Sequence, residues 1–397
     1  MESIYNLQSP TSFLIIFCIV FYSLILFVTS KKISKDNNVL RDFILLCLFC
    51  IFSFQDTDWF HYVEIFKSYS TPETFTFSYD FLFGKTEYSH MEKIYSYLAY
   101  YSFNNYLLFR LIIWGPALVM FFLACKNLGV KLSYVLYYFV PLFLLLFCYG
   151  RVSLAFSMAF YGYSLIVMNF DRKFYNKKTL ITKKKSFASL VLSTITGGFF
   201  IVASLLFHKS VGILLPVFVI SIIPLTKKTM LVYMILFVSI IVVVKNIQGY
   251  LTLFDQQESL TISSLQYELE NKTTGDSGSL LRQFITYYLK YVPYYLFLFY
   301  QVKDVYSVKK MEFPISIKLI SNCAILLILI ATAFLLAGLY TFFYRFIMFS
   351  MIPISITLAY SHFFAQNNRG VIFRRVGIFL AYYKLLYTLY LAFVGAL

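Results

Sequence analysis

The sequence predicts an all-α polytopic membrane protein with about twelve transmembrane helices. Of its 397 residues, 60% are hydrophobic and only 13% are charged, whereas soluble domains average about 25% charged residues. The apolar residues gather in runs of spanning length that short polar segments separate. The net charge of +16 is spread between these runs, so membrane topology explains it better than nucleic-acid binding does.

Twelve apolar runs are expected to form the membrane helices. In chain order they are 10–30, 42–54, 105–125, 132–149, 152–170, 187–207, 211–225, 229–248, 282–301, 315–338, 343–363 and 372–394. The runs 42–54 and 211–225 are short for a hydrocarbon core of about 30 Å, so a tilted or partly re-entrant path is expected there. The first run lacks a preceding basic residue and a following cleavage site, which favours a helix over a signal peptide. Residues 1–397 are therefore expected to form a single integral membrane domain.

The basic residues predict the orientation of these helices. With the N-terminus outside, 22 of the 34 lysines and arginines fall on the cytoplasmic side, as the positive-inside rule requires. Both termini are then outside, and the two long outer loops are 55–104 and 249–281. Residues 58–69 would be amphipathic as a helix and are expected to lie in the interface plane. Residues 92–103 are too short to span, which predicts a second surface or re-entrant helix.

Two carboxylates stand where the second apolar run meets the first outer loop. Asp56 and Asp58 are two residues apart. Aspartate is a common N-cap, and one of the two is expected to cap the helix that follows. The other is then free to act as a base or to bind a cation.

Several cationic residues fall outside the cytoplasmic set, near the predicted outer ends of different helices. They are Arg110, Arg151, Arg282 and Arg345, together with the pair His208-Lys209. A charged side chain deep in the bilayer costs roughly 2.5–3.5 kcal/mol on insertion scales, so it is expected to face a cavity or a partner. Snorkelling to the headgroups explains any one of them alone. Their number favours a cluster that binds an anionic lipid head, above all a pyrophosphate, because guanidinium matches phosphate in a bidentate way.

With these residues in order, the chain resembles the EpsG/Wzy-type family of bacterial polysaccharide polymerases. The matching pieces are Asp56-Thr57-Asp58 with Tyr62, Glu92-Lys93-Ile94-Tyr95 with Leu98, Tyr149-Gly150-Arg151, Phe207-His208-Lys209-Ser210 and Tyr344-Arg345. The chain departs from the family after the third motif, where Val152-Ser153 stands in place of a frequent glutamine.

The resemblance implies a glycosyl transfer at the outer face of the bacterial cytoplasmic membrane, by an architecture compatible with that of the GT-C glycosyltransferases. A growing glycan on undecaprenyl pyrophosphate would move onto the next lipid-linked repeat unit of an O-antigen, capsule or other exopolysaccharide, releasing undecaprenyl pyrophosphate. The implied partners are the lipid-linked donor and acceptor, membrane lipids and a Wzz-type chain-length regulator. Nucleic acid is not among them.

The implied chemistry assigns roles to the singled-out residues. Arg151, Arg282 and Arg345 would stabilise the departing diphosphate, with Arg110, His208 and Lys209 contributing. The general base for the acceptor hydroxyl would come from Asp56, Asp58, Glu92 and His208, with Asp56 the first choice. Arginines can neutralise the diphosphate, so the reaction requires no metal or other cofactor.

The sequence leaves three alternative functions open, of which the first fits less well than a polymerase. A flippase or transporter for the lipid-linked glycan would be expected to show charges at the bilayer midplane and an inverted repeat. An O-antigen ligase and a glycosyltransferase using a polyprenyl-phosphate sugar stay within enzymes and are poorly separated from the polymerase.

Overall fold

The structure is a computed structural model that describes eight segments of the chain and some isolated residues. The segments are 101–103, 105–130, 150–171, 187–207, 209–223, 225–251, 314–337 and 340–364, and the isolated residues are 18–20, 22, 41, 44, 45, 47, 48, 66, 98, 292, 295, 296, 299 and 382. All regular structure in these segments is helical, and they contain no strand. The predicted all-α fold is confirmed.

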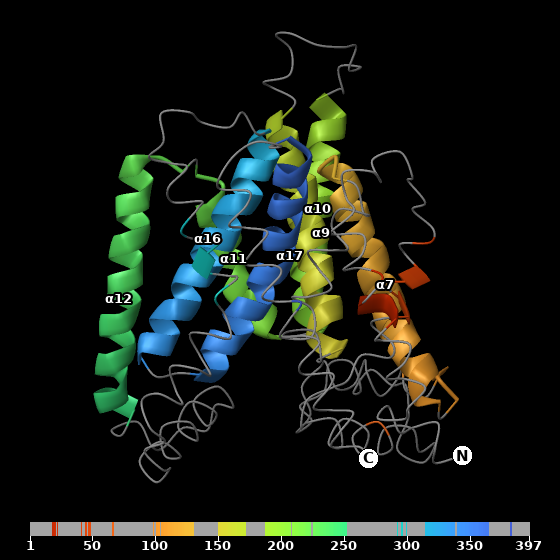
Figure 1. Cartoon of the computed structure of the whole chain (residues 1–397), viewed down its shortest axis with the longest axis horizontal. Coiled ribbons are helices and arrows are strands. Elements are labelled where there is room, and N and C mark those ends of the chain that lie inside the picture. Colours follow the sequence, from red (N-terminus) through yellow and green to blue (C-terminus); the bar gives the residue numbers. More distant parts are fainter. Residues whose placement is uncertain are drawn as a thin grey trace.

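Seven α-helices and one 3₁₀ helix make up the described bundle (Figure 1). They are α7 (Tyr106–Asn127), α9 (Gly150–Asp171), α10 (Phe187–Phe207), η4 (Lys209–Ile213, 3₁₀), α11 (Leu214–Ser221), α12 (Lys227–Leu251), α16 (Ile315–Ala337) and α17 (Tyr340–Phe364). Four of these are long and apolar enough to cross a membrane: α7, α9, α10 and α16. The protein is a membrane protein.

Seven of the twelve predicted runs coincide with these helices. The other five, 10–30, 42–54, 132–149, 282–301 and 372–394, lie largely or wholly outside the described residues. The same holds for the outer loops 55–104 and 249–281 and their surface helices. The number of twelve spans and the outward position of both termini therefore stay predictions.

The run 211–225 differs in detail from a simple spanning helix. Residues 209–213 form η4, α11 ends at Ser221, and helical structure resumes only at Lys227. Pro224 follows in the sequence, and a proline disfavours the helical conformation of the residue before it. The apolar helix in this run is therefore shorter than a spanning helix, and the tilted or partly re-entrant path expected for it stays a prediction.

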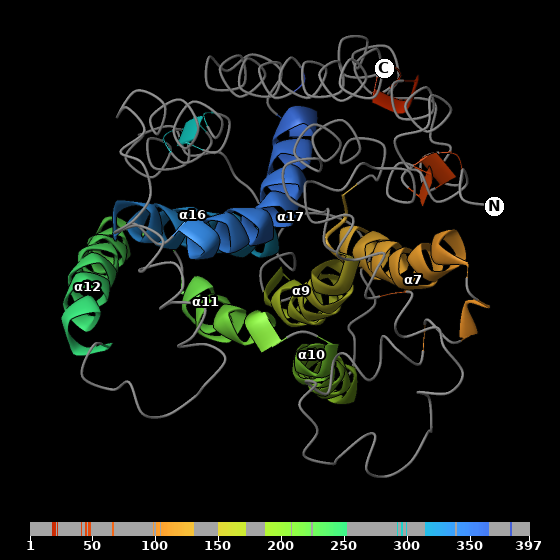
Figure 2. The same cartoon turned by 90° about the horizontal axis from the view of Figure 1, so that it is seen from below.

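Helix α9 lies at the centre of the bundle. It packs against α7, α10 and α16, and the Phe156 ring lies 5.0 Å from the Phe349 ring of α17. Viewed end-on, α9 is surrounded by its neighbours, whereas α12 stands at the edge beside α16 (Figure 2).

Two glycines allow α9 and α10 to touch through their backbones. A Cβ added at Gly197 would lie 2.6 Å from the Gly162 carbonyl oxygen, and one at Gly162 would collide with the Gly197 carbonyl. Close approach at small residues is a common way to pack membrane helices, since lipid tails supply no hydrophobic drive for association. Farther along, the Asn169 amide donates to the Ser193 hydroxyl at 2.9 Å, which shows that the helices are antiparallel.

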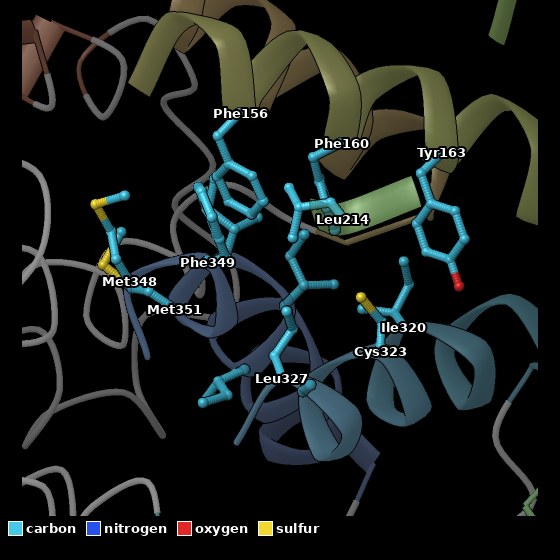
Figure 3. Close-up of a cluster of buried hydrophobic side chains, with 14 of the residues drawn as sticks. Phe156, Phe160, Tyr163, Leu214, Ile320, Cys323, Leu327, Met348, Phe349 and Met351 are labelled. Carbon is cyan, nitrogen blue, oxygen red and sulfur yellow. The ribbon is translucent and has the colours of Figure 1, made fainter. Parts of the chain in front are cut away.

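The core forms where α9, α11, α16 and α17 meet (Figure 3). Phe156 of α9 packs against Phe349 of α17, and Tyr163 of α9 points towards Cys323 of α16 (Figure 3). All four side chains are almost fully buried. By contrast, α10 and α12 carry exposed apolar side chains along their outer faces: Leu192, Ile195, Phe199, Val202, Leu231, Val232, Ile235 and Val238. In a membrane protein such a surface faces lipid.

The helix directions place several starting turns at one end of the bundle. The Asp171 carboxylate at the end of α9 accepts from the Ser316 backbone N–H at 2.9 Å, so α9 and α16 are antiparallel. Helix α17 turns back on α16, with the Phe334 and Phe346 rings 5.3 Å apart. Helices α9 and α17 therefore begin at the same end.

Helix α7 and η4 begin at that end too. The last residue of α7, Asn127, donates to Ser164 in the second half of α9, and because the two helices pack extensively they must run parallel. Segment η4 starts directly after α10 ends, and α10 is antiparallel to α9. Four helical segments thus start at one end of the bundle, the lower end in Figure 1.

Candidate functional site

Four of the nine predicted site residues lie in described helices, and five do not. The four are Arg110, Arg151, Lys209 and Arg345. Asp56, Asp58, Glu92, His208 and Arg282 lie outside the residues that the structure describes, so the predicted base and one predicted pyrophosphate ligand are not located.

The four located cations share one position in the fold. Arg110 lies in the second turn of α7, Arg151 is the second residue of α9, Lys209 opens η4 and Arg345 lies in the second turn of α17. Since these segments all start at the same end of the bundle, four cationic residues from distant parts of the chain come to that end. We call it the arginine end, defined by Arg110, Arg151, Lys209 and Arg345. The side chains of Arg151 and Lys209 lie outside the described part.

The opposite end carries lysines, and we call it the lysine end. It is defined by Lys126 at the end of α7, Lys227 and Lys228 at the start of α12, and Lys318 at the start of α16. All four side chains are exposed. These residues belong to the set that the sequence predicts on the cytoplasmic side.

Arg110 faces the inside of the protein. Only 3% of its surface is exposed, and it shares the buried face of α7 with Ile113, Trp114 and Ala117. A side chain that snorkels along a lipid-facing surface would be exposed. Simple snorkelling therefore does not describe this arginine, and its charge must be compensated inside the protein or by a ligand.

An aromatic residue from the predicted first outer loop, Phe66, packs onto the helix of Arg110. Phe66 is 3% exposed, and its ring lies 5.3 Å from that of Tyr106 and 5.1 Å from that of Phe109. Its segment, 58–69, also contains Asp58. In the sequence, Asp58 lies eight residues before Phe66. The sequence marks Phe66 only as apolar and gives no signal of its partner.

Arg345 rests on a stack of phenylalanines. Its guanidinium carbon lies 5.8 Å from the centre of the Phe342 ring, and Phe342 stacks on Phe334 at 5.2 Å. A cation over an aromatic face is attracted by the ring quadrupole, and this orients the plane of the guanidinium. The N–H groups along the edge of that plane can donate to an anion. The sequence motif Tyr344-Arg345 does not indicate this stack.

The arginine end favours anions through its backbone as well as its side chains. Helices α7, α9 and α17 point their N-termini there, and a helix N-terminus carries roughly half a positive charge. At α7, the Asn105 side chain already accepts from the Leu108 N–H at 3.1 Å. Among the described residues, no three His, Cys, Asp or Glu side chains gather to hold a metal ion. The helix N-termini and the located cationic residues can each attract an anion.

Comparison with known proteins agrees with the resemblance seen in the motifs. No curated protein and no solved structure matches the chain. A family model does match: the EpsG family, over residues 38–396. That range contains every described helix from α7 to α17 and all nine candidate site residues. The chain belongs to the EpsG family.

Proposed function

We propose that the chain is a polysaccharide polymerase that joins undecaprenyl-pyrophosphate-linked repeat units at the outer face of the bacterial cytoplasmic membrane. Membership of the EpsG family supports a polysaccharide polymerase-type function in general. The lipid-linked substrate, the reaction and the side of the membrane belong to this proposal.

One observation carries the proposal beyond the family: the convergence of Arg110, Arg151, Lys209 and Arg345 at one end of the bundle. Cations gathered at one end of the bundle suit a polyprenyl diphosphate, because its lipid tail stays in the membrane while its anionic head group lies at the surface, where guanidinium and ammonium groups can donate to the phosphate oxygens.

The proposed reaction is a substitution at the anomeric carbon of the donor. The acceptor hydroxyl oxygen forms a bond to that carbon, and the bond from carbon to the phosphate oxygen breaks. The bonding electrons leave with undecaprenyl pyrophosphate, and the hydroxyl proton passes to a base. Negative charge grows on the diphosphate as the bond breaks, so cations fixed beside it stabilise the transition state more than the ground state.

Asp56 is the first candidate for the base, with Asp58, Glu92 and His208 as alternatives. A base must come within hydrogen-bond reach of the acceptor hydroxyl. The packing of Phe66 on Tyr106 and Phe109 supports a place for the acidic motif near the arginine end. Arg282 would complete the cationic set.

The experiment that tests the function is deletion of the gene in its own host, with surface glycan resolved on a gel. Loss of the long-chain ladder while a single repeat unit stays attached supports a polymerase. Complete loss of surface repeats, with lipid-linked units trapped inside the cell, indicates a flippase instead. An unchanged ladder would overturn the proposal. Complementation with the intact gene controls for effects on neighbouring genes.

A further inference from the structure

Helix α11 is too short to cross the membrane alone. With eight residues in α11 and five in η4, the pair spans about 22 Å, less than the hydrocarbon core of about 30 Å. Its inner end, Ser221, is fully buried. The end of a helix leaves carbonyl groups without helical partners, and in a membrane such groups must be satisfied by protein.

Asn322 of α16 supplies the missing donors. Its amide nitrogen lies 3.3 Å from the Ser221 carbonyl oxygen and 3.0 Å from that of Ile223. Asn322 is itself buried. It lies about two turns, or about 10 Å, into α16, so the break after α11 is held well inside the bundle.

A tyrosine of α9 also bonds to the inner end of α11. The Tyr163 and Ser221 hydroxyl oxygens are 2.6 Å apart, and the Tyr163 hydroxyl lies 3.3 Å from the Leu319 carbonyl, to which it can donate. Figure 3 shows the Tyr163 side chain pointing from α9 towards α16. The Tyr163 ring also stacks on Phe218 of α11, 4.5 Å between centres. Three helices are thus joined at one level; we call this group, Tyr163, Ser221 and Asn322, the polar lock.

The other contacts of α11 keep it in the bundle but do not set its position along its own axis. Its buried side chains Leu214, Val217 and Phe218 are apolar, and apolar contacts tolerate sliding better than directional hydrogen bonds do. The segment η4 precedes α11 without a break, and it starts with Lys209 at the arginine end. Because η4 continues directly into α11 and also packs against α9 and α10, a shift of α11 along its axis would distort η4, in which Lys209 lies.

We propose that Asn322 is a positioning residue: by holding the inner end of α11, it sets the place of η4 and Lys209 at the arginine end. The inference rests on the proposed function for its effect on glycosyl transfer, but its effect on position can be measured without any substrate. Asn322 does not touch the reacting groups, since its contact with Ser221 lies about 12 Å from η4 along α11 and about 20 Å from Lys209.

The chain offers a matched control for this residue. Asn169 of α9 also joins two helices through its amide, to Ser193 at 2.9 Å and Thr194 at 3.2 Å of α10. Neither of these two hydrogen bonds involves α11. The variants Asn322→Leu and Asn169→Leu remove the same chemical group from two interhelical contacts, and only the first releases the polar lock.

The first measurement is the rate at which a charged maleimide labels Ser210→Cys, in opened membranes, with the chain lacking this substitution as background. Asn322→Leu is expected to change the rate, because η4 moves, and Asn169→Leu is expected to leave it unchanged. An unchanged rate in Asn322→Leu, or an equal change in both variants, overturns the inference. Asn322→Gln keeps the amide donor and is expected to restore part of the original rate.

The second measurement is polymer formation by the same membranes, without the cysteine, from lipid-linked repeat units. Asn322→Leu is expected to lower kcat roughly 10- to 100-fold, since a misplacement of about 1 Å can cost that much, with little change in KM. In a Lys209→Ala background the same substitution should have little further effect, because the two residues act through one another. Fully additive losses would mean that Asn322 acts on overall folding, which overturns the inference.

The two proposals fail in different ways. Normal polymer formation by a variant with altered labelling overturns the positioning role, although the polymerase itself still stands. A deletion strain with an unchanged glycan ladder overturns the polymerase, whatever the labelling rates are.

Discussion

The two ends of the bundle hold their positive charges in opposite ways. At the lysine end, Lys126, Lys227, Lys228 and Lys318 are all exposed. At the arginine end, Arg110 is buried and Arg345 is half-buried against Phe342. Exposed lysines keep much of their hydration, whereas a buried guanidinium such as that of Arg110 has lost water, and its hydrogen bonds must be replaced within the protein or by a ligand.

This difference separates two causes of a basic sequence. The lysine end fits the positive-inside pattern, which is a matter of membrane insertion. The arginine end is not explained by that pattern, because burial adds a cost that insertion does not require. A comparison of composition alone would treat both ends as equal. Substitutions at the two ends should therefore have very different consequences.

The largest effect is expected at the arginine end. Arg345→Ala should lower chain elongation about 100-fold or more, because removing a single donor from a site of developing charge costs roughly that much. The glycan ladder and the amount of protein in the membrane are measured together. A normal ladder from Arg345→Ala would contradict the role of the arginine end in binding the diphosphate. Loss of the protein itself would instead indicate a structural role.

A large effect on stability is expected at the crossing of α9 and α10. Gly197→Leu should destabilise the protein by about 1–3 kcal/mol or more, because the side chain has no space against the Gly162 backbone. Thermal unfolding in detergent measures this change. The neighbouring Gly198 has open space beside it, so Gly198→Leu is the matched control and should unfold close to the temperature of the original chain. Equal midpoints for the two variants would rule out a tight crossing.

A smaller effect is expected at the lysine end, where the Asp171 carboxylate joins α9 to α16. Asp171→Ala removes the acceptor of the Ser316 N–H and should cost about 1 kcal/mol, the usual value of a helix cap. Asp171→Asn keeps an acceptor oxygen and should cost less. Thermal unfolding distinguishes the two variants. Elongation should be unaffected, and a strong loss of polymer from Asp171→Asn would show that the two ends are functionally coupled.

The smallest effect is expected for the exposed lysines. Lys318→Ala should change stability by no more than about 0.5 kcal/mol, as is usual for surface substitutions, and should leave the glycan ladder intact. It is the reference against which Arg345→Ala is judged. A Lys318→Ala variant as inactive as Arg345→Ala would remove the distinction between the two ends.

The sequence determined the helical membrane fold and, for the helices that the structure describes, their approximate limits. The predicted run 187–207 has the same bounds as α10, and 315–338 differs from α16 by one residue, because long apolar runs leave the backbone no alternative in lipid. The motifs also identified the EpsG family, which the family match confirms. The assignment of site residues stays a prediction, since five of the nine lie outside the described residues.

Only the tertiary structure decided which residues of these helices contact one another and which become buried. Nothing in the local pattern of Asn322 indicates that it holds the end of α11, or that Arg110 is buried while Lys318 is exposed. Gly162 and Gly197 meet only because α9 and α10 cross there. The hydropathy of each residue is known from the sequence, so apolar runs can be recognised along the chain. Partners in contact depend on which faces meet, and that is set by packing between segments far apart in sequence.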